Sequence, residues 1–497
     1  MTTSKTAINF ALAKNGEKTC TLNGIYLHSS YSPSKEAQKF VESVNFNFIP
    51  SCILIIEPGL SYCEQFLRNK FPNAKLYAIR IFKDFYKADN LWDEVFYFFE
   101  TENFAQKLYS VLSEEALLSA GILNLPSCNS AIPDLTQRVW SEIKKAILIS
   151  NNVLLTRSYF SKKWFLNSLN FFSLLKKVYI PKKISKDIIV TASGPSLESS
   201  LKNIKSFRCE FFILALSSSL PVLLKREIIP DMVLSTDGGF WAKKHLEFNS
   251  KTQKLLQSTI FAFCDESAFP KKILKNNKIL PLCYEKSLGE VFFKEFEIPF
   301  IYALRNGTVS GTAAALALAL TSANVYFCGL DLAPNPSFQH AKPNVFEIRD
   351  ENFDRRLFTK ETRLASSRFN STSSLEIYAD WFKSQNENFY KRIFRLSSNW
   401  KYSNNLFPLK DLDWKNIRFC KNHDKILFDE KKVVVSKNQL LKIAEKIILD
   451  DKNIGELFPK ENLILARSKD EEERKKIEEE INLKKLDFME KIKRRFL

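Results

Sequence analysis

Short apolar runs alternate with amphipathic segments in the first part of the chain. SCILIIEPG (51–59) predicts a buried strand followed by a turn, and AKLYAIRI (74–81) predicts a second strand. Between them, LSYCEQFLRNKF (60–71) has the spacing of a helix. From residue 92 to about residue 177, Leu, Phe and Ile recur at three- and four-residue steps, which indicates mostly helical structure. We therefore expect a Rossmann-like α/β domain with a helical part over residues 1–180.

Strand and helix patterns alternate more regularly over residues 181–400. Each strand-like run there leads into a loop of small or acidic residues or into a helical pattern, in segments 182–204, 210–228, 230–239, 258–266, 299–320 and 324–333. Such alternation is typical of a mostly parallel sheet with helices on both faces. The sequence predicts an α/β fold whose central domain is Rossmann-like.

The pattern weakens after about residue 400, and residues 401–497 are predicted to form a mostly helical C-terminal domain. Its last thirty residues read as one charged helix. An apolar face along this helix predicts packing against a core or a partner, with a membrane-surface or RNA-binding helix as the alternative. The face consists of Ile477, Ile481, Met489, Ile492 and Phe496.

Composition and charge argue against several classes of protein. The net charge of +18 attracts anions in general, yet the lysines are spread along the chain and form no basic stripe, which argues against nucleic-acid binding as the main role. The longest weakly polar run, residues 309–323, is too short to span a bilayer. The nine cysteines include no C-x-x-C pair, so neither a zinc site nor a disulfide framework is indicated. Free thiols and the lack of an apolar export signal predict a cytoplasmic protein.

Two loops at predicted strand ends could bind an anionic ligand or a sugar. In TASGPSL (191–197), Gly194 permits close backbone approach, and Ser196 stands at the start of a helix whose N–H groups suit an anion. A tight turn with Ser196 as helix cap is the alternative. In STDGG (235–239), Asp237 suits a ribose hydroxyl, a sugar hydroxyl or a metal, or it caps the following turn.

Two further loops complete the set. In NGTVSGT (306–312), Thr308 and Ser310 are donors to a phosphate at the start of an Ala-rich helix, or they cap that helix. Asp331 closes a buried strand, where a carboxylate is costly unless it bonds a partner. His340 follows on the loop that leaves this strand, where a general base could lie, although a surface histidine is the alternative.

These four motifs together resemble a known family. IIVTASGPSL, then ALSSSLPVLLKREIIPDMVLSTDGG, then NGTVSGTAAALAL, then VYFCGLDLA followed by His-Ala look like the motility accessory factor family of flagellin glycosyltransferases. The shared domain is also similar to 6-hydroxymethylpterin diphosphokinase, and its fold resembles that of bacterial sialyltransferases. The resemblance covers about residues 180–395. The first domain also looks like this family's, but its turn after the first strand has only Gly59 where the family has G-x-G, which puts a second nucleotide site in doubt.

The resemblance implies a metal-independent transferase without a bound cofactor. It would move a nonulosonic acid, such as pseudaminic or legionaminic acid, from a CMP-activated donor to Ser or Thr hydroxyls of flagellin. By the same resemblance, Gly194 and Ser196 would face the nucleotide, and Asp237 would lie near the nucleotide or the sugar. Thr308 and Ser310, with Asn306 in the same loop, would bind the donor, and Asp331 would lie beside them. The acceptor hydroxyl needs a base, for which His340 is the candidate, and Tyr378 could donate to the phosphate. For Tyr378, a place in a helix core is the competing interpretation.

Two other functions remain open from the sequence. An ATP-dependent diphosphokinase would need a magnesium–phosphate site, which Asp237 and Asp331 could supply. A non-catalytic adaptor would bind flagellin through the helical C-terminal region and leave the sugar pocket unused.

Overall fold

The computed structural model describes the chain except for residues 1–7, 101–102, 334–337, 397–403, 420–426 and 497, and it describes no side chains for 364–374. Cys420 lies outside the described residues. Contacts group the chain into two compact units. The N-terminal unit comprises residues 1–161 and 448–491, and the central unit comprises 162–447 and 492–497. The predicted boundaries of three domains stay predictions.

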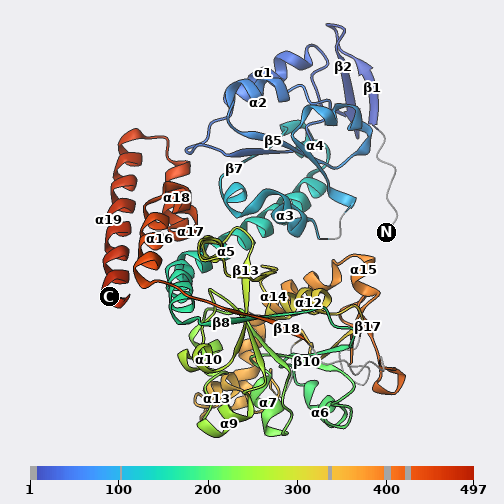
Figure 1. The fold of residues 1–497 in the computed structure, drawn as a ribbon. Coiled ribbons are helices and arrows are strands. Elements are labelled where there is room, and N and C mark those ends of the chain that lie inside the picture. Colours follow the sequence, from blue (N-terminus) through green and yellow to red (C-terminus); the bar gives the residue numbers. More distant parts are fainter. Residues whose placement is uncertain (1–7, 101–102, 334–337, 397–403, 420–426, 497) are drawn as a thin grey trace. The chain divides into compact units, whose positions relative to one another are not determined.

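The N-terminal unit contains a four-stranded parallel sheet and a three-stranded antiparallel sheet. The parallel sheet has the order β6-β5-β4-β7, from Cys52–Ile56 (β4), Lys75–Arg80 (β5), Glu94–Tyr97 (β6) and Ala120–Asn124 (β7). The antiparallel sheet joins Ile8–Leu12 (β1), Lys18–Leu22 (β2) and Ile25–Tyr26 (β3). Every residue of β4 is buried, as expected for an apolar run covered on both faces. Both predicted strands are therefore present (Figure 1).

The N-terminal unit also contains helices. They are Pro33–Ser43 (α1), Glu64–Lys70 (α2), Phe104–Leu118 (α3), Pro126–Ala131 (α4), Ile454–Leu457 (α17) and Pro459–Arg467 (α18). Two long helices, Pro133–Leu174 (α5) and Glu471–Phe496 (α19), are divided between the units, after residues 161 and 491 respectively. The segment from 92 to 177, predicted as mostly helical, also holds β6 and β7. The spacing of apolar residues cannot separate such short strands from helix.

The central unit contains a nine-stranded sheet in which every strand pair is parallel. Its order is β14-β13-β12-β11-β10-β9-β15-β16-β17. The strands are Ile188–Thr191 (β9), Phe212–Leu216 (β10), Met232–Ser235 (β11), Ile260–Cys264 (β12), Lys278–Tyr284 (β13), Ile301–Ala303 (β14), Val325–Cys328 (β15), Ile393–Arg395 (β16) and Lys410–Asp411 (β17). The predicted α/β class with a parallel central sheet is confirmed.

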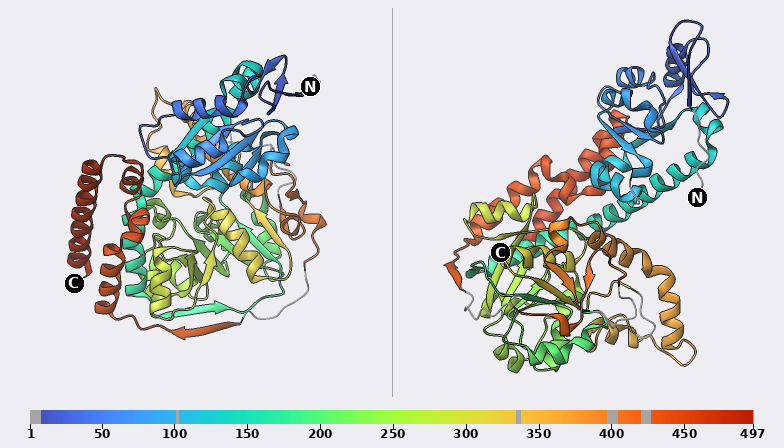
Figure 2. Two further views of the ribbon diagram at one scale, coloured as in Figure 1. Left: turned by 90° about the horizontal axis from the view of Figure 1, so that it is seen from above. Right: turned by 90° about the vertical axis from the view of Figure 1, so that its right-hand side faces the viewer.

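Helices lie on both faces of this sheet (Figure 1). The helices of the central unit are Leu197–Ser206 (α6), Leu220–Lys225 (α7), Phe240–Lys244 (α8), Ser250–Leu255 (α9), Lys271–Asn276 (α10), Leu288–Glu295 (α11), Val309–Leu320 (α12), Val345–Glu351 (α13), Lys360–Lys383 (α14) and Glu387–Tyr390 (α15), and Lys437–Leu449 (α16) follows β18. An antiparallel pair of Lys177–Pro181 (β8) and Phe428–Lys432 (β18) is visible as two long arrows in the left view of Figure 2.

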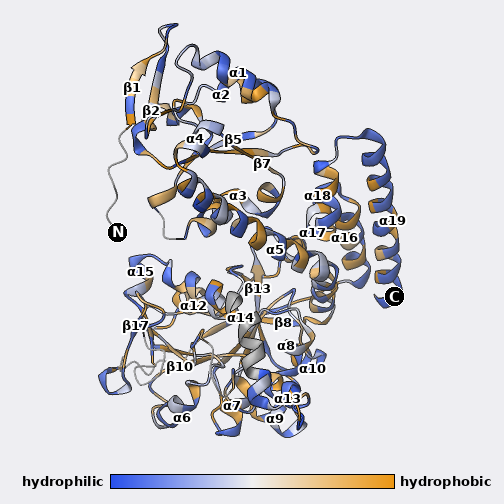
Figure 3. Ribbon diagram, turned by 180° about the vertical axis from the view of Figure 1, so that it is seen from behind, coloured by the Kyte–Doolittle hydropathy of each residue, from blue (hydrophilic) through white to orange (hydrophobic). Residues whose placement is uncertain are grey.

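Hydrophobic residues concentrate in the strands, while α19 is mostly hydrophilic (Figure 3). The apolar face predicted for α19 is present, because Ile481, Met489, Ile492 and Phe496 are buried and Ile477 is half-buried. None of the described helices combines the length and the apolar character needed to cross a bilayer.

Candidate functional site

The order of the central sheet reverses beside β9, and this reversal sets where a ligand can enter. The strands from β10 to β14 extend from β9 in one direction, and β15 to β17 extend in the other. In open parallel sheets, ligands bind beyond the carboxyl ends of the strands at such a reversal. The loops that follow β9 and β15 meet there, and both were predicted as site loops.

Asp331 and Ser196 are in direct contact at this point. The Asp331 carboxylate accepts a hydrogen bond from the Ser196 backbone N–H at 2.9 Å and a very short one from the Ser196 hydroxyl. Burial raises the pKa of Asp331, while the bonds from Ser196 and the charge of Arg395 act to lower it. The anion at the start of α6 is thus a carboxylate of the chain itself.

Close packing of these two loops depends on glycine. A Cβ on Gly194 would lie 2.5 Å from the Gly329 carbonyl oxygen and 2.6 Å from Asp331 Oδ2. Gly329 also has a φ of +75°, a conformation that glycine adopts without strain. The small residues therefore let one loop approach the other, and Gly194 contacts Asp331.

Arg395 and Asn405 hold the backbone on the other side of Asp331. Arg395 is fully buried, pairs with Asp411 at 2.5 Å and donates to the Leu330 carbonyl at 3.0 Å. Asn405 donates to the Asp331 carbonyl at 2.9 Å and accepts from Arg395 at 2.7 Å. Arg395 and Asn405 were not predicted as site residues. The signal that could have indicated Arg395 is its place at the end of the short apolar strand β16.

Asp237 follows β11 and is exposed. Its Oδ1 accepts a hydrogen bond from the Gly239 N–H at 2.7 Å, so the carboxylate also shapes its own turn. Tyr378, on α14, is half-buried, and its pKa is raised by burial and by the charge of Asp237. A Cβ on Gly307 would lie 3.9 Å from the Tyr378 ring, which places Tyr378 beside both predicted loops.

The loop before α12 is organised by its own polar side chains. Thr308 caps the helix by accepting from the Ser310 N–H at 3.3 Å, and Asn306 Oδ1 accepts from the Thr308 N–H at 3.3 Å. The Asn306 Nδ2 is buried and has no hydrogen-bond partner within the described part of the chain. A Cβ on Gly311 would lie 1.9 Å from that nitrogen. α12 contacts β9, β10, β11, β14 and β15, and its N-terminus follows the carboxyl end of β14 after a short loop.

His340 lies on the loop after β15, and Glu347 binds it. The His340 Nδ1 is 3.2 Å from Glu347 Oε1, which also accepts the backbone N–H groups of Gln339 and His340. Burial acts to raise the pKa of Glu347, but the His340 side chain and these N–H groups outweigh it, so that the pKa is lowered. The Ala341 N–H donates to the Ser193 carbonyl at 2.8 Å, which joins this loop to the loop after β9.

The predicted site residues thus form two groups along one sheet edge. Gly194, Ser196 and Asp331 contact one another, and the loop of His340 is bonded to theirs. The second group consists of Asp237, Tyr378 and three residues of the loop before α12, namely Asn306, Thr308 and Ser310.

A cluster of charged and aromatic side chains beyond β12 and β14 was not predicted. Arg305 Nη2 donates to both carboxylate oxygens of Glu266, at 2.8 and 2.9 Å. Beneath them, Asp265 is fully buried and accepts from the Ser168 hydroxyl at 2.5 Å. Burial and the charge of Glu266 raise the pKa of Asp265 to about 7, against the opposing effects of Ser168 and Arg305. The acidic pair at the end of the apolar run IFAFC was the signal available in the sequence.

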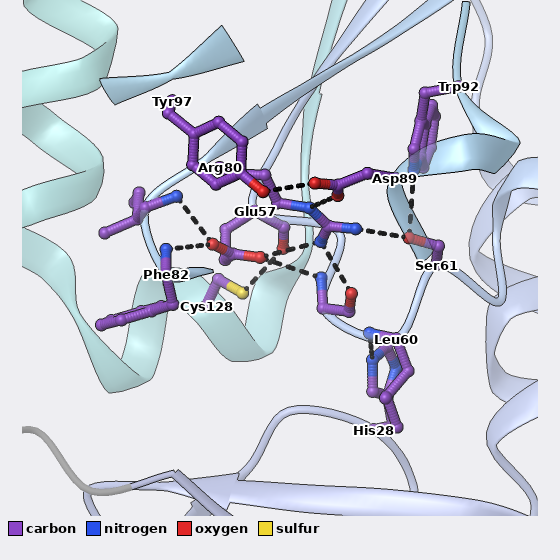
Figure 4. A network of polar contacts seen from close by, with 12 residues as sticks. His28, Glu57, Leu60, Ser61, Arg80, Phe82, Asp89, Trp92, Tyr97 and Cys128 are labelled. Atoms are coloured by element: carbon purple, nitrogen blue, oxygen red, sulfur yellow. Dashed lines mark hydrogen bonds and ion pairs between the residues drawn. The ribbon is translucent and has the colours of Figure 1, made fainter. Parts of the chain in front are cut away.

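The corresponding strand ends of the N-terminal unit are filled by a buried ion network (Figure 4). Arg80 is fully buried and donates to Glu57 at 3.1 Å, Asp89 at 2.9 Å, the Gly59 carbonyl at 2.7 Å and Ser61 at 3.0 Å. Burial raises the pKa of Glu57, which the Arg80 charge and two backbone N–H groups oppose. The polar groups of this turn therefore bind one another.

Comparison with known proteins assigns the central part of the chain. Residues 163–336 match the family described as 6-hydroxymethylpterin diphosphokinase MptE-like. This part of the chain is therefore similar to the MptE-like family. The match agrees with the resemblance predicted from the four motifs. It includes the loops after β9, β11 and β14 and the start of the loop after β15 with Asp331, and it ends before His340.

One curated protein and one solved structure are similar to a larger share of the chain. An uncharacterized protein of Treponema pallidum (strain Nichols) is 31% identical over 294 residues, which cover 59% of this chain and 63% of that protein. The solved structure of a Maf glycosyltransferase from Magnetospirillum magneticum AMB-1 is 14% identical, with a TM-score of 0.46 over 68% of this chain and 61% of that one. The chain spans less than two thirds of the length of either of these two proteins.

Proposed function

We propose that the chain is a glycosyltransferase that moves a nonulosonic, sialic-acid-like sugar from a CMP-activated donor to Ser or Thr hydroxyls of flagellin. The observation that carries the proposal is the arrangement of four motif loops on one edge of the MptE-like domain's sheet. These loops are the ones whose residues resemble the flagellin glycosyltransferases. Their small and hydroxyl-bearing residues suit an anionic leaving group.

In this proposal, the phosphate of the donor binds at the N-terminus of α12. The N–H groups there favour an anion, and Asn306, Thr308 and Ser310 add side-chain donors. The buried Asn306 Nδ2 supports this choice, because an amide donor without a partner is costly to bury. Asp331 already occupies the corresponding groups at the start of α6, so Ser196 and Gly194 shape the wall of the site rather than hold the phosphate.

The remaining predicted residues bind the sugar donor or activate the acceptor hydroxyl. Asp237 and Tyr378 lie beside the donor loop, where they can bond hydroxyls of the ribose or the sugar. His340, oriented by Glu347, takes the proton from the acceptor hydroxyl as that oxygen attacks the anomeric carbon. The bond from that carbon to the phosphate breaks, and CMP leaves with the electron pair. No metal ion enters this scheme.

A transfer assay tests the proposal. The purified full chain is mixed with a CMP-activated nonulosonic acid and flagellin, with and without EDTA, and the flagellin mass is measured. We expect one sugar mass per modified hydroxyl in both conditions. Unchanged flagellin, together with no thermal stabilisation of the chain by millimolar CMP, would overturn the proposal.

A pterin diphosphokinase is a second candidate, which the description of the matching family favours. It would use ATP and Mg²⁺, with Asp237 and Asp331 as the carboxylates nearest to the metal. However, Asp331 bonds Ser196 and Asp237 bonds Gly239. Transfer of diphosphate from ATP to a hydroxymethylpterin that stops in EDTA would select this activity over sugar transfer.

A further inference from the structure

The cluster of Arg305 and Glu266 adjoins the proposed donor site. Glu266 is buried, whereas the Arg305 side chain is 45% exposed, so the cation reaches the surface of the sheet edge. Its guanidinium lies 4.2 Å from the centre of the Tyr284 ring and 5.6 Å from that of Trp164. One carboxylate and two aromatic rings thus fix the position of a half-exposed arginine.

Trp164 links this cluster to the loop of Asp237. A Cβ on Gly238 would lie 2.4 Å from Trp164 Cδ1, so the indole packs directly on that glycine. Asn167, one turn further along α5, donates to the Glu266 carbonyl at 2.9 Å and to the Gly238 carbonyl at 3.4 Å. The cluster and the turn after β11 therefore form one continuous surface.

We propose that this surface is the subsite for the sugar half of the donor and that Arg305 recognises a carboxylate on that sugar. The inference rests on the proposed function and adds to it the residue that selects acidic sugars. In a CMP-nonulosonic acid, the carboxylate and the phosphate are attached to the same anomeric carbon. Arg305 and Asn306 are consecutive in one loop, so a phosphate at Asn306 brings that carboxylate next to Arg305.

The chemistry of the cluster suits this ligand. A guanidinium carries its charge on a planar fork of N–H donors that matches a carboxylate, so a half-exposed arginine can bind a ligand carboxylate beside Glu266. Glu266 balances the arginine charge before the ligand binds. The half-buried Trp164 offers an apolar face to the carbon skeleton of the sugar.

A binding experiment with paired probes tests the subsite. N-acetylneuraminic acid, its methyl ester and CMP are titrated separately against the full chain, against Arg305→Gln and against Arg226→Gln. Arg226 is an exposed arginine just after α7, at the opposite edge of the sheet, and it serves as the matched control. We expect the wild-type chain to bind the acid roughly 10-fold or more tightly than the ester, the usual worth of a charge-assisted bond. The Arg226 variant should match it, whereas Arg305→Gln should bind acid and ester alike.

Each outcome decides a specific claim. Equal binding of acid and ester by the wild type, or a preference for the acid that survives in Arg305→Gln, overturns the subsite whatever CMP does. A preference that depends on Arg305, without any binding of CMP, supports the subsite and overturns the proposed transferase. Binding of CMP without a preference for the acid over the ester supports the proposed transferase and overturns the subsite. If none of the probes binds, the subsite and the proposed transferase are both overturned. If Arg305→Gln does not fold, the acid–ester contrast in the wild type alone decides.

Discussion

At the scale of single residues, the sequence indicated the chemical types but not their partners. Ser196 was expected to offer its donors to a ligand, yet Asp331, 135 residues away, accepts both of them. The sequence alone does not reveal this pairing because it arises from the order of strands, in which β9 and β15 are neighbours. The pairing of Arg305 with Glu266 was missed for the same reason. The two residues follow β14 and β12, which lie on either side of β13 in the sheet, and the sequence does not reveal this strand order.

His340 carries a prediction about rate. If it is the general base, His340→Ala should lower kcat for sugar transfer by roughly 10²–10⁴-fold, the usual contribution of a positioned base. Binding of CMP should stay unchanged, because the imidazole acts on the acceptor hydroxyl. Steady-state kinetics and a CMP titration measure the two effects. Normal turnover in the variant would remove His340 from the mechanism.

Asp265 carries a prediction about stability and pH. Its pKa of about 7 in the folded chain exceeds the unfolded value of about 3.9, so the folded state holds the proton more tightly. The stabilisation from this group is therefore complete below about pH 4 and is lost as the pH rises towards 7. Asp265→Asn should remove this decline in the free energy of unfolding. Denaturant titrations at pH 5, 6, 7 and 8 compare the two chains, and parallel pH profiles would contradict the assignment.

At the scale of elements, apolar runs and small-residue loops were enough to predict most of the central sheet. Strands β9 to β12, β14 and β15 all lie in segments predicted as strands. β13 was missed, and its Pro281 explains why, since proline lacks the N–H that a central strand donates. β6 and β7 were assigned to helix because four or five residues are too few to establish a period.

Gly311 provides a test of how α12 is positioned. Alanine in a helix ordinarily stabilises by up to about 1 kcal/mol relative to glycine. Here the added Cβ would meet Asn306 Nδ2, so Gly311→Ala should instead destabilise by about 1–3 kcal/mol and weaken CMP binding. The control is Gly311→Ala combined with Asn306→Ala, which removes the clash and should recover most of the stability. Equal unfolding free energies for the single and double variants would show that the amide does not restrain the helix.

At the scale of the whole molecule, segments far apart in the sequence complete the N-terminal unit. The Ile49 N–H donates to the Arg467 carbonyl at the end of α18, and Ser161 donates to the Leu457 carbonyl at the end of α17. Arg157 pairs with Glu114, Glu115 and Glu456. Nothing in the sequence pattern of α17 and α18 indicated that they pack with residues more than 290 positions earlier, because local spacing reports amphipathic faces but not their partners.

A substitution of Phe458 tests whether α17 and α18 stabilise the N-terminal unit. It is buried between α17 and α18, and replacing a buried phenylalanine by alanine typically costs about 3–5 kcal/mol. Because the C-terminal helices belong to the N-terminal unit, Phe458→Ala should speed amide exchange in β4, β5 and β7 and leave β9 to β12 protected as before. Hydrogen exchange read by mass spectrometry measures both sets of strands in one sample. Leu463→Ser, at a buried site on α18, should act in the same direction, whereas the exposed Ile464→Ser should not. If amide exchange became faster in β9 to β12 instead, α17 and α18 would stabilise the central sheet. That result would contradict the division of the chain into two units.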